Sequence, residues 1–334
     1  MPDVSLEYMG SFSSQKGKYF IADSVKFLTS GYYDQIKGKV QLLLTSPPFP
    51  LNNQKSYGNL EGNAYLEWFS ALAPIFSSLL TEDGSLVIEI GNAWEKKRPV
   101  QSLLPLQALL SLVNHPQSEL RLIQQFICYN PARLPSPAAW VTINRWRAVD
   151  SYTNIWWLAK TDFPKADNKK VLRPYSKSMQ KLLQRKKYNA GRRPSGHVIS
   201  AESFNLNNGG AIAHNFFESE ALDPAREVRL PNAFSFANTI STDFHAMACR
   251  RENIAPHPAK MPLGLAAFFI QFLTDKGDLV LDPFAGSNTT GFMAELLGRE
   301  WLGVEINQKY AREAWLRFAD PQLSYRGRCH GNRS

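Results

Sequence analysis

The chain has 334 residues, of which 44% are hydrophobic and 20% charged, a composition typical of folded globular proteins. Its length suits one large domain, or a catalytic domain with a modest second lobe. The most apolar stretches, 103–113 and 264–273, are too short to span a bilayer and predict buried helices, and residues 1–5 do not resemble a signal peptide.

The charge and the cysteine content indicate the kind of partner and the cellular setting of the protein. The formal net charge of +9 and the pI of about 9.4 favour a polyanionic partner, because each neutralised phosphate releases counterions. The three cysteines, Cys128, Cys249 and Cys329, are scattered and suggest no disulfide framework. No histidine pair has metal-ligand spacing beside a cysteine or carboxylate cluster, so we expect no metal and a reducing, cytoplasmic setting.

Short apolar runs and helical patterns follow one another along the chain. We expect strands at 19–22 and 40–45, a helix at 64–80, strands at 86–90 and 154–159, a helix at 264–274, a strand at 279–281, a helix at 290–297 and a strand at 301–305. This alternation favours an α/β fold, with a mostly parallel, twisted, Rossmann-like sheet and helices on both faces.

The strand at 40–45 ends in the tetrapeptide Ser46, Pro47, Pro48, Phe49. Two prolines have no N–H and fixed φ angles, so they predict a stiff elbow that presents its carbonyl groups. The Ser46 hydroxyl and the Pro47 carbonyl can accept hydrogen bonds, and Phe49 offers a flat apolar face. A planar heterocycle bearing an amino group would suit this site.

Between residues 162 and 256 the composition changes. Eleven basic residues and only one acidic residue lie between Lys165 and Arg193, and small, polar segments follow. We expect an inserted, irregular, loop-rich region rather than more of the sheet, with a surface for nucleic acid. Its candidate DNA-binding residues are Arg173, Lys186, Lys187, Arg192, Arg193 and His197.

A turn rich in small residues, at 282–291, follows the strand at 279–281. In open α/β sheets such turns lie against ligands at the carboxyl ends of strands. Gly286 and Ser287 would let a ligand approach the backbone closely, Asn288 can adopt the left-handed conformation, and Thr289 or Thr290 can cap the next helix.

The next strand ends at Glu305, about 20 residues beyond this turn, where a carboxylate can bind two ribose hydroxyls. The turn has neither the Gly-Lys-Ser/Thr of a phosphate loop nor the three glycines of a nicotinamide site. The pattern therefore predicts a cofactor held by its adenosine and a charged tail, not by a pyrophosphate.

The two motifs together, Ser46–Phe49 and Asp282–Thr290, resemble those of the amino-methyltransferases of bacterial restriction–modification systems. The catalytic motif comes first, then a variable region, then the cofactor motif, which resembles the β-group order. Serine in first place resembles the N4-cytosine enzymes; the N6-adenine enzymes usually begin with Asp or Asn and end with Tyr. Asn288 departs from the glycine of many relatives, although some N4-cytosine enzymes share it.

The resemblance implies a methyltransferase fold that uses S-adenosylmethionine, with the cofactor held by Asp23, Pro258, Asp282, Phe284, Gly286, Ser287, Asn288 and Glu305. It implies a catalytic half at 1–161, a target-recognition region at 162–256 and a cofactor-binding half at 257–334. The substrate would be double-stranded DNA, with the target cytosine flipped into the pocket. A cognate restriction endonuclease would be a functional partner without a stable complex, and the enzyme could act as a monomer in the bacterial cytoplasm.

Several alternatives stay open at this stage. An N6-adenine methyltransferase fits the pocket almost equally well, because both bases offer an amino group on a flat ring. A DNA-binding homologue that has lost catalysis and the cognate endonuclease are further hypotheses. Methylation at C5 of cytosine is disfavoured, because it needs a cysteine nucleophile, commonly after proline, and no cysteine here follows a proline.

Overall fold

The computed structural model describes residues 11–50, 60–130, 133–185, 190–200, 206–218, 234–235, 244–255, 257 and 260–319. The strand β3 (Val40–Thr45) shows how the core is built, since all six of its residues are buried. Leu42 and Leu44 pack into one hydrophobic cluster and Leu43 into another, on the opposite face of the sheet. An apolar run without alternation is thus the signature of a strand that helices cover on both sides.

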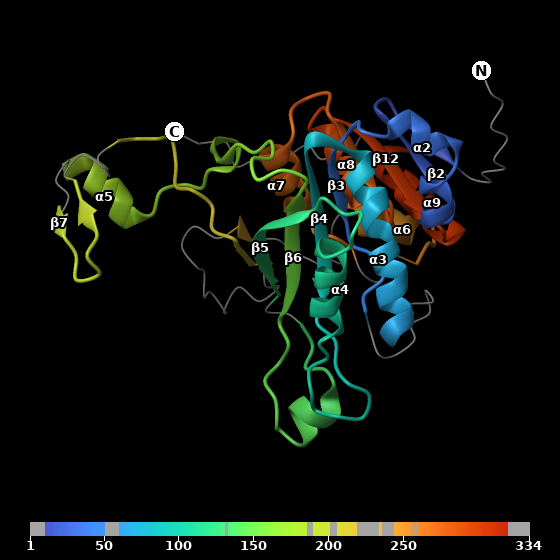
Figure 1. The fold of residues 1–334 in the computed structure, drawn as a ribbon, viewed down its shortest axis with the longest axis horizontal. Helices are drawn as coiled ribbons and strands as arrows, with labels where there is room; N and C mark the ends of the chain where they lie inside the picture. The colour runs from blue at the N-terminus through green and yellow to red at the C-terminus, as the bar shows by residue number, and fades with distance from the viewer. Residues whose placement is uncertain are drawn as a thin grey trace.

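The described elements form one large sheet between two layers of helices (Figure 1). In chain order they are β1 (Phe12–Ser13), β2 (Gly17–Ile21), α1 (Ser24–Leu28), α2 (Gly31–Ile36), β3, α3 (Gly62–Leu79), β4 (Leu80–Gly91), α4 (Leu104–Val113), β5 (Arg121–Tyr129), the π-helical turn η1 (Ala139–Ile143), β6 (Tyr152–Ala159), the 3-10 turn η2 (Asn168–Val171), α5 (Lys177–Arg185), β7 (Gly191–Arg192), β8 (Val198–Ile199), β9 (Phe216–Glu218), β10 (Phe234–Ser235), α6 (Phe244–Arg251), α7 (Leu263–Leu273), β11 (Leu279–Asp282), α8 (Thr289–Leu296), β12 (Glu300–Glu305) and α9 (Gln308–Ala319).

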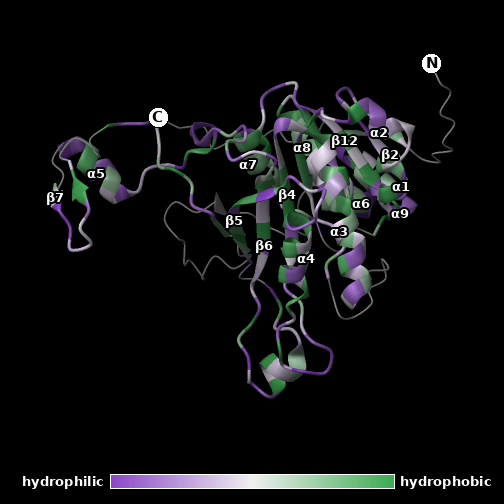
Figure 2. Cartoon of the chain, viewed as in Figure 1, coloured by the Kyte–Doolittle hydropathy of each residue, from purple (hydrophilic) through white to green (hydrophobic). Residues whose placement is uncertain are grey.

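The strand order of this ten-stranded sheet is β1-β2-β12-β11-β3-β4-β6-β5-β9-β10. The strands from β2 to β4 are parallel, whereas β6 runs antiparallel to both of its neighbours. Helices α7 and α8 pack on one face, and α3 and α4 on the other. The hydrophobic colour of β4 and α7 in Figure 2 follows from this double covering. The expected mostly parallel α/β sheet is confirmed.

All six expected strands and all four expected helices are present, and Trp156 and Trp157 lie in the core. The prediction of a buried helix at 103–113 was only partly right, because α4 exposes Leu106 and Leu110 on its outer face. Strand β5 was not expected from the sequence, since its apolar residues alternate with exposed Arg121, Gln124 and Gln125. No helix among the described residues is long and apolar enough to cross a bilayer.

The stretch 162–256 differs from expectation in one respect. Strand β9 pairs with β5 and extends the main sheet, and β10 follows it at the edge, so part of this stretch does belong to the sheet. The reason is the stacked pair Phe126 and Phe217, whose ring centroids are 5.4 Å apart and which join β5 and β9 in the core. By contrast, α5 and the β7–β8 hairpin stand away from the sheet, at the left of Figure 1. We call this part (residues 177–200) the side lobe.

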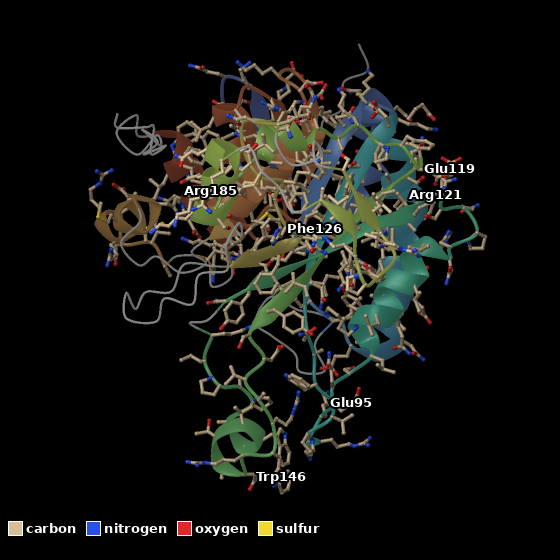
Figure 3. All side chains as sticks on the ribbon, turned by 90° about the vertical axis from the view of Figure 1, so that its left-hand side faces the viewer. Glu95, Glu119, Arg121, Phe126, Trp146 and Arg185 are labelled. Atoms are coloured by element: carbon tan, nitrogen blue, oxygen red, sulfur yellow. The ribbon has the colours of Figure 1, made fainter. Side chains whose placement is uncertain are left out.

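A second projection leaves the sheet from the ends of β4 and β5. It consists of residues 92–101 and 133–150, including η1, and extends downward in Figure 1. We call these residues the arm. In Figure 3, Trp146 lies at its far end.

Candidate active site

A pocket of about 350 Å³ lies at the carboxyl ends of β3, β11 and β12. Since these neighbouring strands are parallel, the segments that follow them meet at one edge of the sheet. The elbow after β3 and the turn after β11 therefore line one cavity, although they are far apart in sequence. Ten of the sequence-predicted residues line it: Asp23, Ser46, Pro47, Pro48, Phe49, Asp282, Phe284, Gly286, Ser287 and Glu305.

A direct hydrogen bond joins the two segments. The Thr45 hydroxyl, on the last residue of β3, donates to Asp282 Oδ1 at 2.7 Å. Asp282 Oδ2 accepts from the Thr290 hydroxyl at 2.8 Å, and Oδ1 also accepts from the Phe284 N–H at 3.1 Å. The carboxylate thus fixes the elbow, the turn and the start of α8 relative to one another. Burial nevertheless raises the pKa of Asp282 to about 6.

Phe49 is positioned by the end of the neighbouring strand β4. An added Cβ atom at Gly91 would lie 2.6 Å from Cε2 of Phe49 and 2.7 Å from its Cδ2. Carbon atoms normally approach no closer than about 3.5 Å, so only glycine at this position leaves room for the ring. Gly91 was not expected as a site residue, because nothing in the sequence links it to Phe49.

The turn after β11 depends on two residues with positive φ. Gly286 has φ +48° and Asn288 has φ 56°, ψ 42°, in the left-handed region. Asn288 is fully buried and does not line the pocket; its side chain occupies the space that a Cβ atom would fill at Gly291 and Gly303. The expected role of Asn288 in the shape of the turn is confirmed, whereas its expected contact with a cofactor is not supported by its position.

The prediction that Thr289 or Thr290 caps α8 was wrong. Asn288 is the N-cap residue and makes no side-chain capping bond. Thr290 instead bonds to Asp282, while Thr289 accepts a hydrogen bond from Arg317 Nη2 at 3.3 Å. Arg317 also donates from Nε to the Ser287 carbonyl at 2.7 Å, so α9 stabilises the turn from behind.

Glu305 ends β12 at the pocket wall and is tied to the turn by its own carboxylate. Oε2 accepts from the Gly286 N–H at 2.9 Å and Oε1 accepts from the Asn307 N–H at 2.8 Å. Burial raises the pKa of this carboxyl group. Tyr19 supports the same turn, because its hydroxyl donates to the Gly286 carbonyl at 2.8 Å.

At the other side of the pocket, Asp23 caps helix α1 by accepting from the Lys26 N–H at 2.9 Å. Twelve further residues line the pocket although they were not named as site residues, and three of them belong to the segment 257–262, which resembles the motif that packs around the methionine end of the cofactor. Most of the twelve are apolar or lie next to an expected residue in the sequence. Their closeness in sequence to the expected residues is the signal by which they could have been predicted. They are Ser24, Val25, Leu60, Trp68, His257, Lys260, Met261, Ala285, Thr289, Thr290, Ile306 and Tyr310.

His257, which lies between two prolines, lines the pocket. Its backbone N–H donates to Glu313 Oε2 at 2.7 Å, and its ring packs against Tyr310 with centroids 4.2 Å apart. Glu313, on α9, also pairs with Lys260 at 3.2 Å. A helical residue 56 positions away thus holds two lining residues, a contact that no local pattern could reveal.

Behind this wall, the fold brings His245, Cys249 and Glu313 together, although the sequence indicated no such cluster. All three are buried, and burial lowers the pKa of His245 to about 3. The ammonium group of Lys260 lies 3.0 Å from His245 Nδ1 and 3.2 Å from Glu313 Oε1. The lysine cation thus already contacts two members of the cluster, and Lys260, His245 and Glu313 form an internal polar network.

Those candidate DNA-binding residues that the structure describes lie outside the pocket lining. Arg192, Arg193 and His197 belong to the β7–β8 hairpin of the side lobe, where the Arg193 N–H donates to the His197 carbonyl at 2.8 Å. Arg173 forms an isolated bridge with Ala211. Lys186, Lys187 and Pro258 lie outside the described residues.

Comparisons with known proteins agree with this geometry. A family described as DNA methylase matches residues 40–315, which contain both the elbow and the turn. The chain belongs to this family. It is 36% identical over 316 residues to the type II methyltransferase M.PvuII of Proteus hauseri, covering 94% of this chain and 87% of that protein.

Solved structures share the fold. The PvuII DNA methyltransferase, described as cytosine-N4-specific, superposes with a TM-score of 0.68 at 30% identity, over 92% of this chain and 88% of that one. TTHA0409 of Thermus thermophilus, solved with S-adenosyl-L-methionine, has a TM-score of 0.50 at 21% identity, over 92% of this chain and 95% of that one. The sheet and its helices therefore form the methyltransferase fold.

Proposed function

We propose that this protein is a site-specific DNA methyltransferase that transfers a methyl group from S-adenosylmethionine to the exocyclic N4 amino group of cytosine in duplex DNA. The observation that carries the proposal is the shared pocket, in which the Ser46–Phe49 elbow faces the Asp282–Ser287 turn. The similarity to a cytosine-N4-specific enzyme over most of both chains supports the choice of base.

The pocket residues suit S-adenosylmethionine. Glu305 presents a carboxylate for the ribose hydroxyls, and Gly286 leaves the turn without a side chain where a ligand would approach. Asp23, Phe284 and Ser287 would hold the rest of the nucleoside, and Pro258 would pack near its methionine end. When bound, S-adenosylmethionine supplies an activated methyl group on a sulfonium, which departs as a neutral thioether.

The elbow would hold the cytosine. Phe49 stacks on the ring, and the N4 hydrogens donate to Ser46 Oγ and the Pro47 carbonyl, with Pro48 keeping the elbow rigid. These acceptors draw electron density onto N4 and stabilise the positive charge that develops there during transfer, and N4 then loses one proton to solvent to give the neutral methylated amine. Positioning of the two reactants supplies much of the remaining rate.

The wider setting extends the same proposal. Residues 162–256 would serve as the target-recognition region between the catalytic half (1–161) and the cofactor-binding half (257–334). The enzyme would act as a monomer in the bacterial cytoplasm and protect sites from a cognate restriction endonuclease without forming a stable complex with it.

Nucleoside mass spectrometry of a plasmid incubated with the protein and S-adenosylmethionine tests the proposal. We expect N4-methylcytosine. N6-methyladenine without N4-methylcytosine would make the protein an adenine enzyme. DNA binding without any methyl transfer would indicate a homologue that has lost catalysis, and Mg²⁺-dependent cleavage would indicate an endonuclease.

A further inference from the structure

The arm (residues 92–101 and 133–150) leaves the sheet at the same edge as the pocket. Strand β4 ends at Gly91, which pairs with Thr153 near the start of β6, and β5 ends at Tyr129, which pairs with Tyr152. Gly91 also contacts Phe49 in the pocket wall. Both parts of the arm therefore begin at the edge of the sheet that carries the elbow. The amino-terminal ends of β3 and β11 lie at the opposite edge of the sheet.

The two parts of the arm are joined to each other. The Arg147 guanidinium lies over the Trp94 ring, 3.1 Å from its centroid, and Asn92 donates to Asp150 at 2.8 Å. At the tip, Trp140 and Trp146 stack with their centroids 5.6 Å apart. These contacts hold the two parts of the arm together, so that the arm forms a single projection with its own side-chain packing.

The arm carries both hydrophilic and hydrophobic residues, as the mixed colours of Figure 2 show, and most of its charged residues are basic. Its six cationic side chains outnumber its two carboxylates, Glu95 and Asp150. At the tip, Trp146 is 66% exposed and Ile143, in η1, is 74% exposed, while Leu134, which follows Arg133 at the base of the arm, is 80% exposed. Cations mixed with exposed aromatic and aliphatic groups match a partner with a phosphate backbone and accessible base edges. The basic residues are Lys96, Lys97, Arg98, Arg133, Arg145 and Arg147.

We propose that the arm is a DNA-binding element of this enzyme, which holds the duplex beside the entrance of the pocket. Lys97, Arg98 and Arg145 contact backbone phosphates, and Trp146 at the tip makes an apolar contact in a groove. This inference rests on the proposed function, because it assumes a duplex DNA substrate. It assigns DNA contacts to a segment outside residues 162–256.

The test measures duplex binding by the full-length protein, by fluorescence anisotropy at several salt concentrations. A triple variant, Lys97→Ala, Arg98→Ala, Arg145→Ala, should lower affinity at least tenfold and reduce the slope of log K against log salt by about two to three. A matched control, Lys37→Ala, Lys39→Ala, Lys276→Ala, removes three exposed cations near the opposite edge of the sheet and should leave both quantities unchanged.

Trp146→Ala should weaken binding with the salt slope intact, and Trp146→Phe should restore most of the affinity. Equal melting temperatures of all variants exclude a folding defect. An unchanged salt slope in the arm variant, or an equal loss in the control, would overturn the proposal, as would concentration-dependent self-association that Trp146→Ala abolishes. Methylation by the wild type separates the two proposals. If the wild type transfers methyl groups and the arm variant binds DNA as well as the wild type does, only the arm proposal fails. If the wild type neither binds nor methylates DNA, both proposals fail.

Discussion

Gly91→Ala should impair catalysis through Phe49 although Gly91 does not line the pocket. The added methyl group would lie 2.6 Å from the ring, so the ring must move by about 1 Å to restore a normal contact. Stacking of a base on an aromatic side chain contributes roughly 1–3 kcal/mol. Loss of this contact would lower kcat/KM for DNA by about five- to 150-fold, while the Kd for S-adenosylmethionine changes less than about twofold.

A double-mutant cycle tests the stated cause. Methyl transfer to a short duplex is measured for Gly91→Ala, Phe49→Ala and the double variant, with cofactor binding followed by calorimetry. If Gly91 acts only by leaving room for the ring, its replacement has little further effect once Phe49 is absent. Full additivity of the two losses would refute the reasoning, because Gly91 would then act independently of Phe49.

Three further predictions concern the pocket. Ser46→Ala should lower the methyl-transfer rate roughly 10²-fold with cofactor affinity nearly unchanged, as measured by single-turnover kinetics; lost cofactor affinity would contradict the assigned role. Glu305→Gln should raise the cofactor Kd about 10- to 150-fold in calorimetry, since both carboxylate oxygens accept backbone N–H groups and an amide nitrogen would face one of them; a change below twofold would contradict this. Asp282 has its pKa raised by burial, from 3.8 to about 6, so the folded state holds its proton more tightly than the unfolded state. The stability of the wild type relative to Asp282→Asn should therefore be greatest below about pH 4 and fall by up to about 3 kcal/mol as pH rises through about 6, as followed by urea denaturation; a difference independent of pH would contradict it.

The sequence was sufficient to predict the mostly parallel sheet and the position of the two motifs in one pocket. All six residues of β3 are buried because helices cover both faces of the sheet, and parallel neighbours necessarily present their carboxyl ends at one edge. The left-handed conformation of Asn288 was also predictable, since a tight turn there requires a residue that tolerates positive φ.

Other features depend on contacts between distant residues, which no local pattern encodes. Gly91 matters because of Phe49, and Glu313 on α9 holds His257 and Lys260, which lie between α6 and α7. The capping prediction failed because Thr290 has a better partner in the buried Asp282 carboxylate. Strand β9 was hidden in a polar stretch because only Phe217 reaches the core.

The most direct test of the shared pocket is a crystal structure of the protein with an S-adenosylmethionine analogue and a duplex containing its target site. The account predicts a flipped cytosine on Phe49, with N4 roughly 3–3.5 Å from the position of the transferable methyl group. An analogue held at the Asp282–Ser287 turn while the target base lies elsewhere, out of reach of that position, would contradict it.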